Sequence, residues 1–353
     1  MLLVRIAVLC FISLLLPVTC CAQSVWTLET SGTAASLRGI HAVSRQIAWV
    51  SGSGGTILRT LDGGRHWTKC ATPPNAIRLD FRAIWAWSAR DAIVMSSGPG
   101  VLSQVFKTAD GGKHWKQMAA NADPQGFWDA MVFENRRKGF VLGDPVNGRF
   151  VLLATTDGGR AWRRPTKRST PPGLKVHDNA GGAFAASNTS LMAGPHEPML
   201  FGGGGAWVYR QTSSHRTGQR SWASVQAPLA HTGQAAGVFS LGYHAGTIVA
   251  VGGDYTRPAD SGGTAAWSRD GGRHWTAAQH PPHGYRSAVA WDAAAHAWIT
   301  VGTNGTDISY DGGQNWQPLG NGSWNALSLP FAVGPKGRIG RLNSAAAPRT
   351  AER

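Results

Sequence analysis

The sequence TLDGGRHW, from Thr60 to Trp67, recurs four more times along the chain with the same skeleton. The other copies are TADGGKHW (108–115), TTDGGRAW (155–162), SRDGGRHW (268–275) and SYDGGQNW (309–316). Their aspartates, Asp62, Asp110, Asp157, Asp270 and Asp311, are separated by 48, 47, 113 and 41 residues, so the long interval holds about two periods. A repeat of roughly 40 to 50 residues that ends each time in a turn is typical of a propeller or a solenoid.

Each copy of this octet has the composition of a hairpin turn. The aspartate can bond the backbone two residues further on, and the two glycines can adopt positive φ angles. The Ser or Thr two places before the aspartate can add a second local bond, and the Trp five places after it can anchor the returning strand. We therefore interpret the five aspartates as structural turn formers and not as ligand-binding groups.

The apolar segments before each octet predict short strands. Around the first copy they lie at 39–43, 47–52, 56–60 and 67–70, which makes one four-stranded propeller blade. The first-strand pattern begins seven times, at Leu37, Phe81, Phe127, Gly181, Ala236, Tyr285 and Trp324. The sequence therefore predicts an all-β, seven-bladed β-propeller, with blades at 37–80, 81–126, 127–179, 180–235, 236–284, 285–323 and 324–343.

The seventh unit stops one strand short. The segment WTLE (26–29) resembles the strand WTKC (67–70) that follows the first octet, yet it precedes the first blade. We predict that residues 24–30 complete the last blade, because this pairing closes the ring and removes exposed strand edges. Residues 344–353 are expected to form a disordered tail.

Residues 1–22 have the features of an export signal. Arg5 precedes an apolar run, 6–16, that is too short to span a bilayer comfortably, and small residues stand before position 23. Cleavage after Ala22 would leave residues 23–343 as one propeller domain, periplasmic or secreted, without a further membrane span. Acylation of Cys20 or Cys21 would instead make a lipoprotein. Only Cys70 lies beyond the signal, so we expect no internal disulfide.

The chain carries a formal net charge of +15. Basic clusters lie at 136–138 and 163–175, and they fit either a solvated face or docking to an anionic partner. The export signal and the lack of a nucleic-acid-binding motif argue against nucleic acid. The sequence has no Cys/His spacing typical of zinc and no glycine-rich phosphate loop, so we expect no metal and no cofactor.

The segment WVSGSGGTILRTLDGGRHW (49–67) resembles the repeat of the photosystem II stability/assembly factor family, and its octet is similar to the Asp-box, or BNR repeat. Six further units follow the same rhythm, so the resemblance covers nearly all of the chain after the signal. It implies an exported, non-enzymatic propeller that binds a protein partner, in photosynthesis or in a related bacterial setting, with arginines of one face contributing. Sialidases and some glycoside hydrolases also carry Asp-boxes, so enzyme activity needs separate arguments.

We expect a binding site on the face opposite the Asp-boxes. First strands should line the channel, and their opening positions hold Arg286, Asn325, Arg38, Arg82 and Asp129 in five consecutive blades. Converging guanidinium groups can bind an anion or a carboxylate, but they can equally be solvated or locally paired, as Arg82 with Asp129. The predicted partner- or anion-binding set comprises Arg38, Arg82, Arg286, Tyr285, Tyr255, Arg257 and Asp144.

Two kinds of enzyme compete with the binding hypothesis. A sialidase needs a tyrosine coupled to a glutamate, and none of the four glutamates, Glu29, Glu134, Glu197 and Glu352, lies in a predicted loop of that face. A glycoside hydrolase needs two carboxylates, which could come from Asp80, Asp129, Asp144, Asp178 and Asp254. A glycoside hydrolase or carbohydrate-binding propeller therefore remains the alternative to a non-catalytic protein-binding one.

Overall fold

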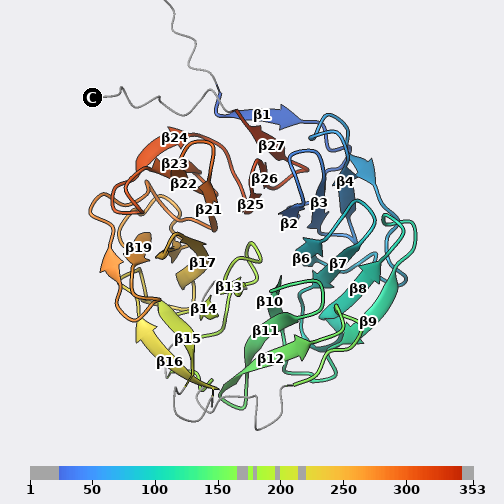
Figure 1. Ribbon diagram of the computed structural model, residues 1–353, viewed down its shortest axis with the longest axis horizontal. Coiled ribbons are helices and arrows are strands. Elements are labelled where there is room, and N and C mark those ends of the chain that lie inside the picture. Colours follow the sequence, from blue (N-terminus) through green and yellow to red (C-terminus); the bar gives the residue numbers. More distant parts are fainter. Residues whose placement is uncertain (1–23, 165–173, 178–180, 195–198, 214–219, 344–353) are drawn as a thin grey trace, which may run out of the picture.

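Seven small antiparallel sheets stand in a ring around a common axis, as the computed structural model shows (Figure 1). The structure describes residues 24–164, 174–177, 181–194, 199–213 and 220–343. The predicted export signal, the predicted tail and most of the basic stretch 163–175 lie outside these residues. The fold is thus the predicted seven-bladed β-propeller, and no helix in the described part of the chain is long and apolar enough to cross a membrane.

Blades one to three follow one another as simple meanders, with each strand paired to the next in sequence. Blade one has β2 (Leu37–Ala42), β3 (Ala48–Gly52), β4 (Ile57–Thr60) and β5 (Thr68–Lys69). Blade two has β6 (Phe81–Ala86), β7 (Ala92–Ser96), β8 (Gln104–Thr108) and β9 (Lys116–Ala120), with the 3-10 helix η1 (Gly100–Leu102) before β8. Blade three has β10 (Trp128–Phe133), β11 (Gly139–Val146) and β12 (Arg149–Thr155).

The remaining blades repeat the meander. Blade four has β13 (Leu191–Met192), β14 (Leu200–Gly202), β15 (Trp207–Ser213) and β16 (Arg220–Gln226). Blade five has β17 (Ala236–His244), β18 (Thr247–Asp254), β19 (Ala265–Ser268) and β20 (Thr276–Ala277). Blade six has β21 (Ala288–Asp292), β22 (Ala297–Gly302), β23 (Gly305–Ser309) and β24 (Gln317–Gly320).

Blade seven closes the ring with strands from both ends of the chain. It contains β25 (Ala326–Ser328), β26 (Phe331–Val333) and β27 (Ile339–Leu342). The strand β1 (Trp26–Glu29) pairs with β27 in antiparallel register, from Trp26 opposite Leu342 to Glu29 opposite Ile339. The indole Nε1 of Trp26 also donates to Thr306 of blade six at 2.9 Å. The first strand therefore completes blade seven by covering the edge of β27, as the sequence predicted, and its Trp26 also joins this blade to blade six.

The five recurring octets form turns of one design, which we call the DGG turns. In the first, the Thr60 hydroxyl donates to Asp62 Oδ1 at 3.0 Å and accepts the Gly64 N–H at 2.9 Å. Asp62 Oδ1 also accepts the His66 N–H at 3.0 Å, and Gly63 and Gly64 have φ angles of 76° and 93°. Hydrogen bonds from the backbone and the ring of His66 lower the pKa of Asp62 to about 2. The carboxylate is therefore engaged within its own turn.

The tryptophan that ends each DGG turn packs between neighbouring blades. Trp115 of blade two meets Trp49 of blade one edge to face, with ring centroids 6.2 Å apart. Trp67 of blade one meets Phe331 of blade seven in the same way at 5.6 Å. Such aromatic pairs add to the burial of apolar area. The turn residue that looks local in sequence therefore holds one blade to the blade before it.

Blade four departs from the sequence prediction. The expected first strand at Gly181 is reduced to an isolated bridge between Ala183 and Gly203, and the regular pairing begins only at β13. The chain from 184 to 190, which we call the plug, lies between them and runs toward the axis of the ring (Figure 1). This is a correction to the predicted blade, and its cause is extra chain: Gly181 stands 19 residues before β14, whereas Leu37 stands 11 before β3.

The plug contacts five other blades, which places it on the axis. Its Ala185 carbonyl accepts from Arg38 of blade one and Arg82 of blade two. Asn188 Oδ1 accepts the Met131 N–H of blade three at 2.7 Å, and the Ser187 hydroxyl donates to the Ser287 carbonyl of blade six at 2.6 Å. Thr189 shares a hydrogen bond of 2.7 Å with Ser240 of blade five. The plug thus occupies the channel that the ring of first strands encloses.

Candidate functional site

A cavity of about 500 Å³, the channel cavity, opens beside the plug on the face opposite the DGG turns. Arg38 and Arg82 enter it from the second positions of β2 and β6, while Asp144 comes from the end of β11. Its floor includes plug residues 184–186. The described residues that line it also include Phe127, Asp129, Ala183, Phe239, Tyr255, Tyr285, Ser287, Thr303 and Asn325.

The two arginines of this cavity are close together and only partly engaged. Arg82 donates through Nε to Asp80 at 2.8 Å and through Nη1 to the Ala185 carbonyl at 3.2 Å. Arg38 donates through Nη2 to the same carbonyl at 3.4 Å, and its buried Nε has no partner among the described residues. Burial, followed by the positive charge of Arg82, lowers the pKa of Arg38. Both guanidinium groups therefore keep donors available for an anionic ligand.

A pair of carboxyl groups lies next to the arginines. Asp129 is buried, and it lines the channel cavity together with Asp144. Burial and the neighbouring Asp144 raise the pKa of Asp129 well above its usual range. Burial also raises the pKa of Asp144, whose Oδ1 accepts the Ala183 N–H at 2.9 Å. The sequence hypothesis paired Arg82 with Asp129, but the structure pairs Arg82 with Asp80 instead.

Aromatic rings form the opposite wall of the channel cavity. Phe184 of the plug stacks on Phe239 with centroids 3.7 Å apart, and Tyr285 meets Phe239 edge to face at 4.8 Å. Burial raises the pKa of Tyr285, which leaves its phenol neutral. Tyr255 packs against the edge of the same cluster and is 52% exposed, at the mouth of the cavity. The cavity thus combines a cationic side, a carboxyl pair and an apolar wall.

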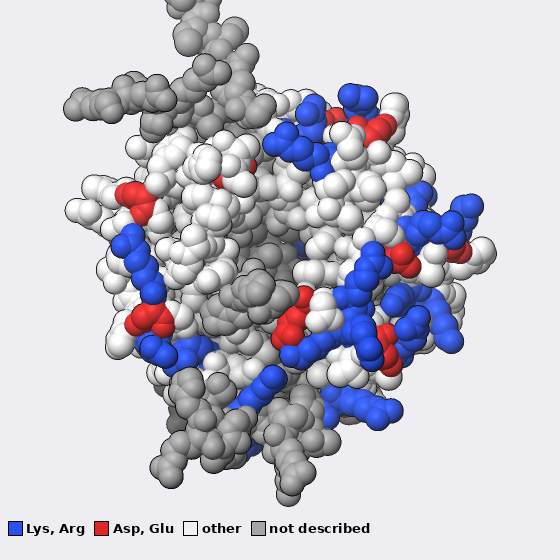
Figure 2. Space-filling model, in the orientation of Figure 1, with Lys and Arg blue, Asp and Glu red and all other residues white. Residues whose placement is uncertain are grey.

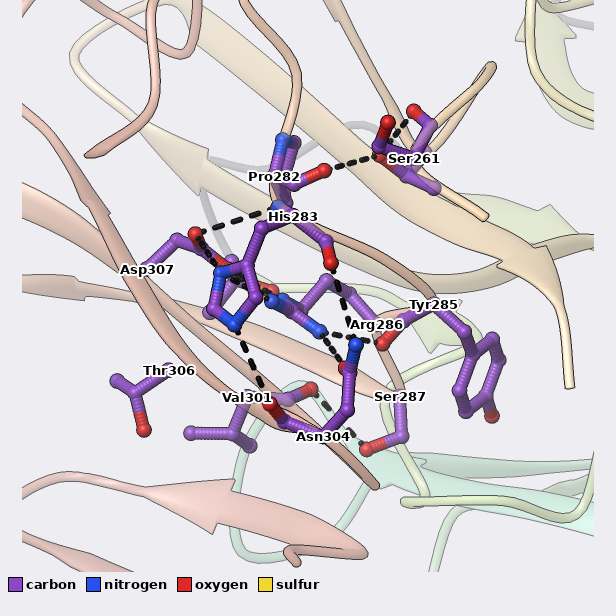
Figure 3. A network of polar contacts seen from close by, with 12 residues as sticks. Ser261, Pro282, His283, Tyr285, Arg286, Ser287, Val301, Asn304, Thr306 and Asp307 are labelled. Carbon is purple, nitrogen blue, oxygen red and sulfur yellow. Dashed lines mark hydrogen bonds and ion pairs between the residues drawn. The ribbon is translucent and has the colours of Figure 1, made fainter. Parts of the chain in front are cut away.

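Arg286 does not join the other two arginines. It precedes β21, its side chain is 0% exposed, and it forms an ion pair with Asp307 in β23 (Figure 3). Its Nε donates to Asp307 Oδ2 at 2.5 Å and its Nη1 donates to Asn304 Oδ1 at 2.6 Å. His283 Nδ1 contacts Asp307 Oδ1 at 2.6 Å. Arg286 therefore holds the link before β21 to blade six, and it cannot face a ligand in the channel.

Arg257 is also separate from the channel cavity. Its Nε lies 3.0 Å from Oδ2 of Asp254, the last residue of β18, and its Nη1 lies 3.6 Å from Asp260 Oδ2 in the loop that follows. It lines a different cavity, beside residues 226–232. Of the predicted set, the structure brings together Arg38, Arg82, Asp144, Tyr255 and Tyr285.

Sequence reasoning missed the plug and its Phe184. The signal was the long interval between Gly181 and β14, which marks an insertion but does not say where the inserted chain goes. Within the described residues, no group of three or more His, Cys, Asp or Glu side chains could hold a metal ion. No glutamate is among the described residues that line the channel cavity.

A scan of protein-family models and a comparison with curated proteins find no match to this chain. Among solved structures, "YCF48 bound to D1 peptide" is 16% identical with a TM-score of 0.59, over 90% of this chain and 96% of that chain. YCF48 from Cyanidioschyzon merolae is 15% identical with a TM-score of 0.63, over 91% and 100%. At such identities the likeness concerns the backbone. The chain therefore has the seven-bladed β-propeller fold that these YCF48 structures share.

Proposed function

We propose that this chain is a non-catalytic propeller that binds a protein partner and holds a carboxylate of that partner in the channel cavity. The observation that carries the proposal is the pair Arg38 and Arg82. Their guanidinium groups line the same cavity and keep hydrogen-bond donors that no described residue uses. Arg38 forms no ion pair among the described residues, so its charge is free to act on a ligand. Arginine forks bind carboxylates through paired hydrogen bonds.

The aromatic wall supports a peptide as the source of this carboxylate. Phe184, Phe239 and Tyr255 offer apolar surface beside the arginines, which suits a side chain next to the anionic group. One of the solved propellers of this fold is described as bound to a peptide, D1, and this supports a peptide ligand here by analogy. We propose in addition that the partner is met outside the cytoplasm, because residues 1–22 have the pattern of an export signal.

The geometry gives less support to glycoside hydrolysis. In glycoside hydrolases the two catalytic carboxyl groups stand about 5 to 9.5 Å apart, with room for the sugar or a water molecule between them. Asp129 is instead only 1% exposed, which gives a sugar little access to its carboxyl group. This pair is better suited to shaping the cavity than to acting as separate acid and base.

The test is a selection from a random peptide library with free C-terminal carboxylates and acidic side chains. Peptides that bind the wild type are measured again on Arg38→Gln and Arg82→Gln, and we expect at least roughly tenfold weaker binding, since each variant removes a charge-assisted contact. Arg257→Gln is the matched control, because Arg257 lies outside the channel cavity; it should change affinity less than about twofold. Failure to select any peptide, or an equal loss in the control, contradicts the proposal.

A further inference from the structure

Another cavity, of about 360 Å³, lies between blades two and three on the face of the DGG turns, and none of its lining residues belongs to the channel cavity. Four cationic side chains line it, and we call it the basic cavity. Lys107 comes from β8, Arg136 and Arg137 from the turn between β10 and β11, and Arg160 from the third DGG turn. Figure 2 shows Lys and Arg gathered over the side of the molecule that carries these strands.

The positive charges around the basic cavity are only partly neutralised. Asp91 and Asp157 also line it, so four positive and two negative groups leave a formal charge of +2. None of the four cations forms an ion pair with a residue that the structure describes. Asp157 Oδ1 is engaged by the N–H groups of its own DGG turn, and Asp91 accepts from the Ser88 hydroxyl at 2.9 Å. Burial, followed by the positive charge of Arg160, lowers the pKa of Lys107.

The four cationic heads are held around the cavity by backbone carbonyls. Lys107 Nζ donates to Gly158 at 2.6 Å and Arg160 Nη1 donates to Asp157 at 3.2 Å. Arg137 Nε donates to Thr156 at 3.3 Å, and Arg136 Nη2 lies 3.5 Å from the Trp87 carbonyl. Each of these side chains donates one hydrogen bond to a described residue. A guanidinium group has five N–H donors in total. The heads are thus positioned, and most of their donors are unused.

We propose that the basic cavity binds a phosphate-bearing ligand with at least two negative charges, such as a phosphate monoester or a diphosphate. The net charge of the lining residues matches a dianion, and donors from three separate chain segments suit the tetrahedral oxygens of phosphate better than a single planar carboxylate. The volume admits a phosphate together with the group that it carries. This chemistry is supplied either by a soluble phosphate compound or by the headgroup of an anionic lipid.

The first experiment is calorimetric titration of the full chain with inorganic pyrophosphate at low ionic strength. We expect the double variant Arg136→Gln/Arg160→Gln to bind at least about tenfold more weakly than the wild type. The control is Arg65→Gln/Arg273→Gln. Both control residues are exposed and stand at the octet position of Arg160, but in blades one and five, away from the basic cavity. The control substitutions remove the same total charge as Arg136→Gln/Arg160→Gln, so the affinity of the control for pyrophosphate should stay within about twofold of the wild type.

A second experiment distinguishes the two sources of the phosphate. Sedimentation with phosphatidylcholine vesicles, with and without phosphatidic acid, is measured for the same three proteins. Binding to the acidic vesicles that depends on Arg136 and Arg160 supports a lipid headgroup, and binding to pyrophosphate alone supports a soluble ligand. Binding of neither probe overturns the proposal, as does an equal loss in the control variant, because the effect would then come from overall charge.

Discussion

The buried carboxyl group of Asp129 lies next to that of Asp144 at the edge of the channel cavity, and the charge of Asp144 adds to burial in raising the pKa of Asp129. Asp129 Oδ2 is buried without a partner among the described residues, so an ionised pair at this place would be poorly solvated. The pair is therefore most stable when it holds a proton. This relationship makes the stability of the propeller depend on pH in a defined direction.

The folded protein should become less stable through this pair as the pH rises. Because the pKa of Asp129 is raised in the folded state, its contribution is fully present below the unfolded value of about 3.9 and is lost as pH rises through the folded value. Asp129→Asn removes this loss. We therefore expect the variant to gain stability relative to the wild type as the pH rises above about 4 in urea unfolding. A stability difference between Asp129→Asn and the wild type that does not change with pH contradicts the prediction.

The ion pair between Arg286 and Asp307 should be essential to blade six. Arg286→Met leaves a buried carboxylate without its charged partner, which typically costs about 3 to 5 kcal/mol. The double variant Arg286→Met/Asp307→Leu removes both charges, so it should be less destabilised than the sum of the single variants. Urea unfolding of the four proteins measures this coupling. Additive effects would show that the two side chains do not depend on each other.

The hydroxyl group of each DGG turn should contribute measurably to stability. Ser268 Oγ donates to Asp270 Oδ1 at 2.9 Å and accepts the buried Gly272 N–H at 3.0 Å. Ser268→Ala leaves this N–H without a partner, at an expected cost of about 1 to 3 kcal/mol. Ser261→Ala, at an exposed position before β19, serves as the control and should stay within about 0.5 kcal/mol of the wild type. Equal unfolding midpoints for both variants would rule out this role.

The closing strand β1 offers a matched pair of substitutions. Trp26 is 3% exposed and bonds Thr306 in blade six, while Leu28 of the same strand is 60% exposed. Trp26→Ala should lower the free energy of unfolding by about 3 to 5 kcal/mol, because it removes a buried side chain and its contact between blades six and seven. Leu28→Ala should change stability by less than about 0.5 kcal/mol. The free energy of unfolding, measured by urea denaturation, checks both, and a similar cost for the two variants would contradict the closing role of Trp26.

The sequence by itself determined the number of blades, the DGG turns and the strand that closes the ring. The DGG turn depends on contacts within a few residues, as between Thr60, Asp62 and Gly64, so its chemistry is visible in one octet. The alternation of apolar and polar residues that predicts a strand is equally local. The missing strand of the last blade was apparent because the other blades show how many strands each repeat should contain.

Only the tertiary structure decided which side chains meet at the axis. Arg38, Arg82 and Arg286 occupy similar positions in the repeat, yet the first two reach the carbonyl of Ala185 while the third is buried against Asp307. Asp307 lies in a regular strand of blade six, which resembles the third strands of the other blades, and the plug is an insertion. Neither feature shows, from the sequence near an arginine, which group that arginine will contact. Contacts between blades arise only when the ring closes, so the partners of each arginine depend on residues far away in the sequence.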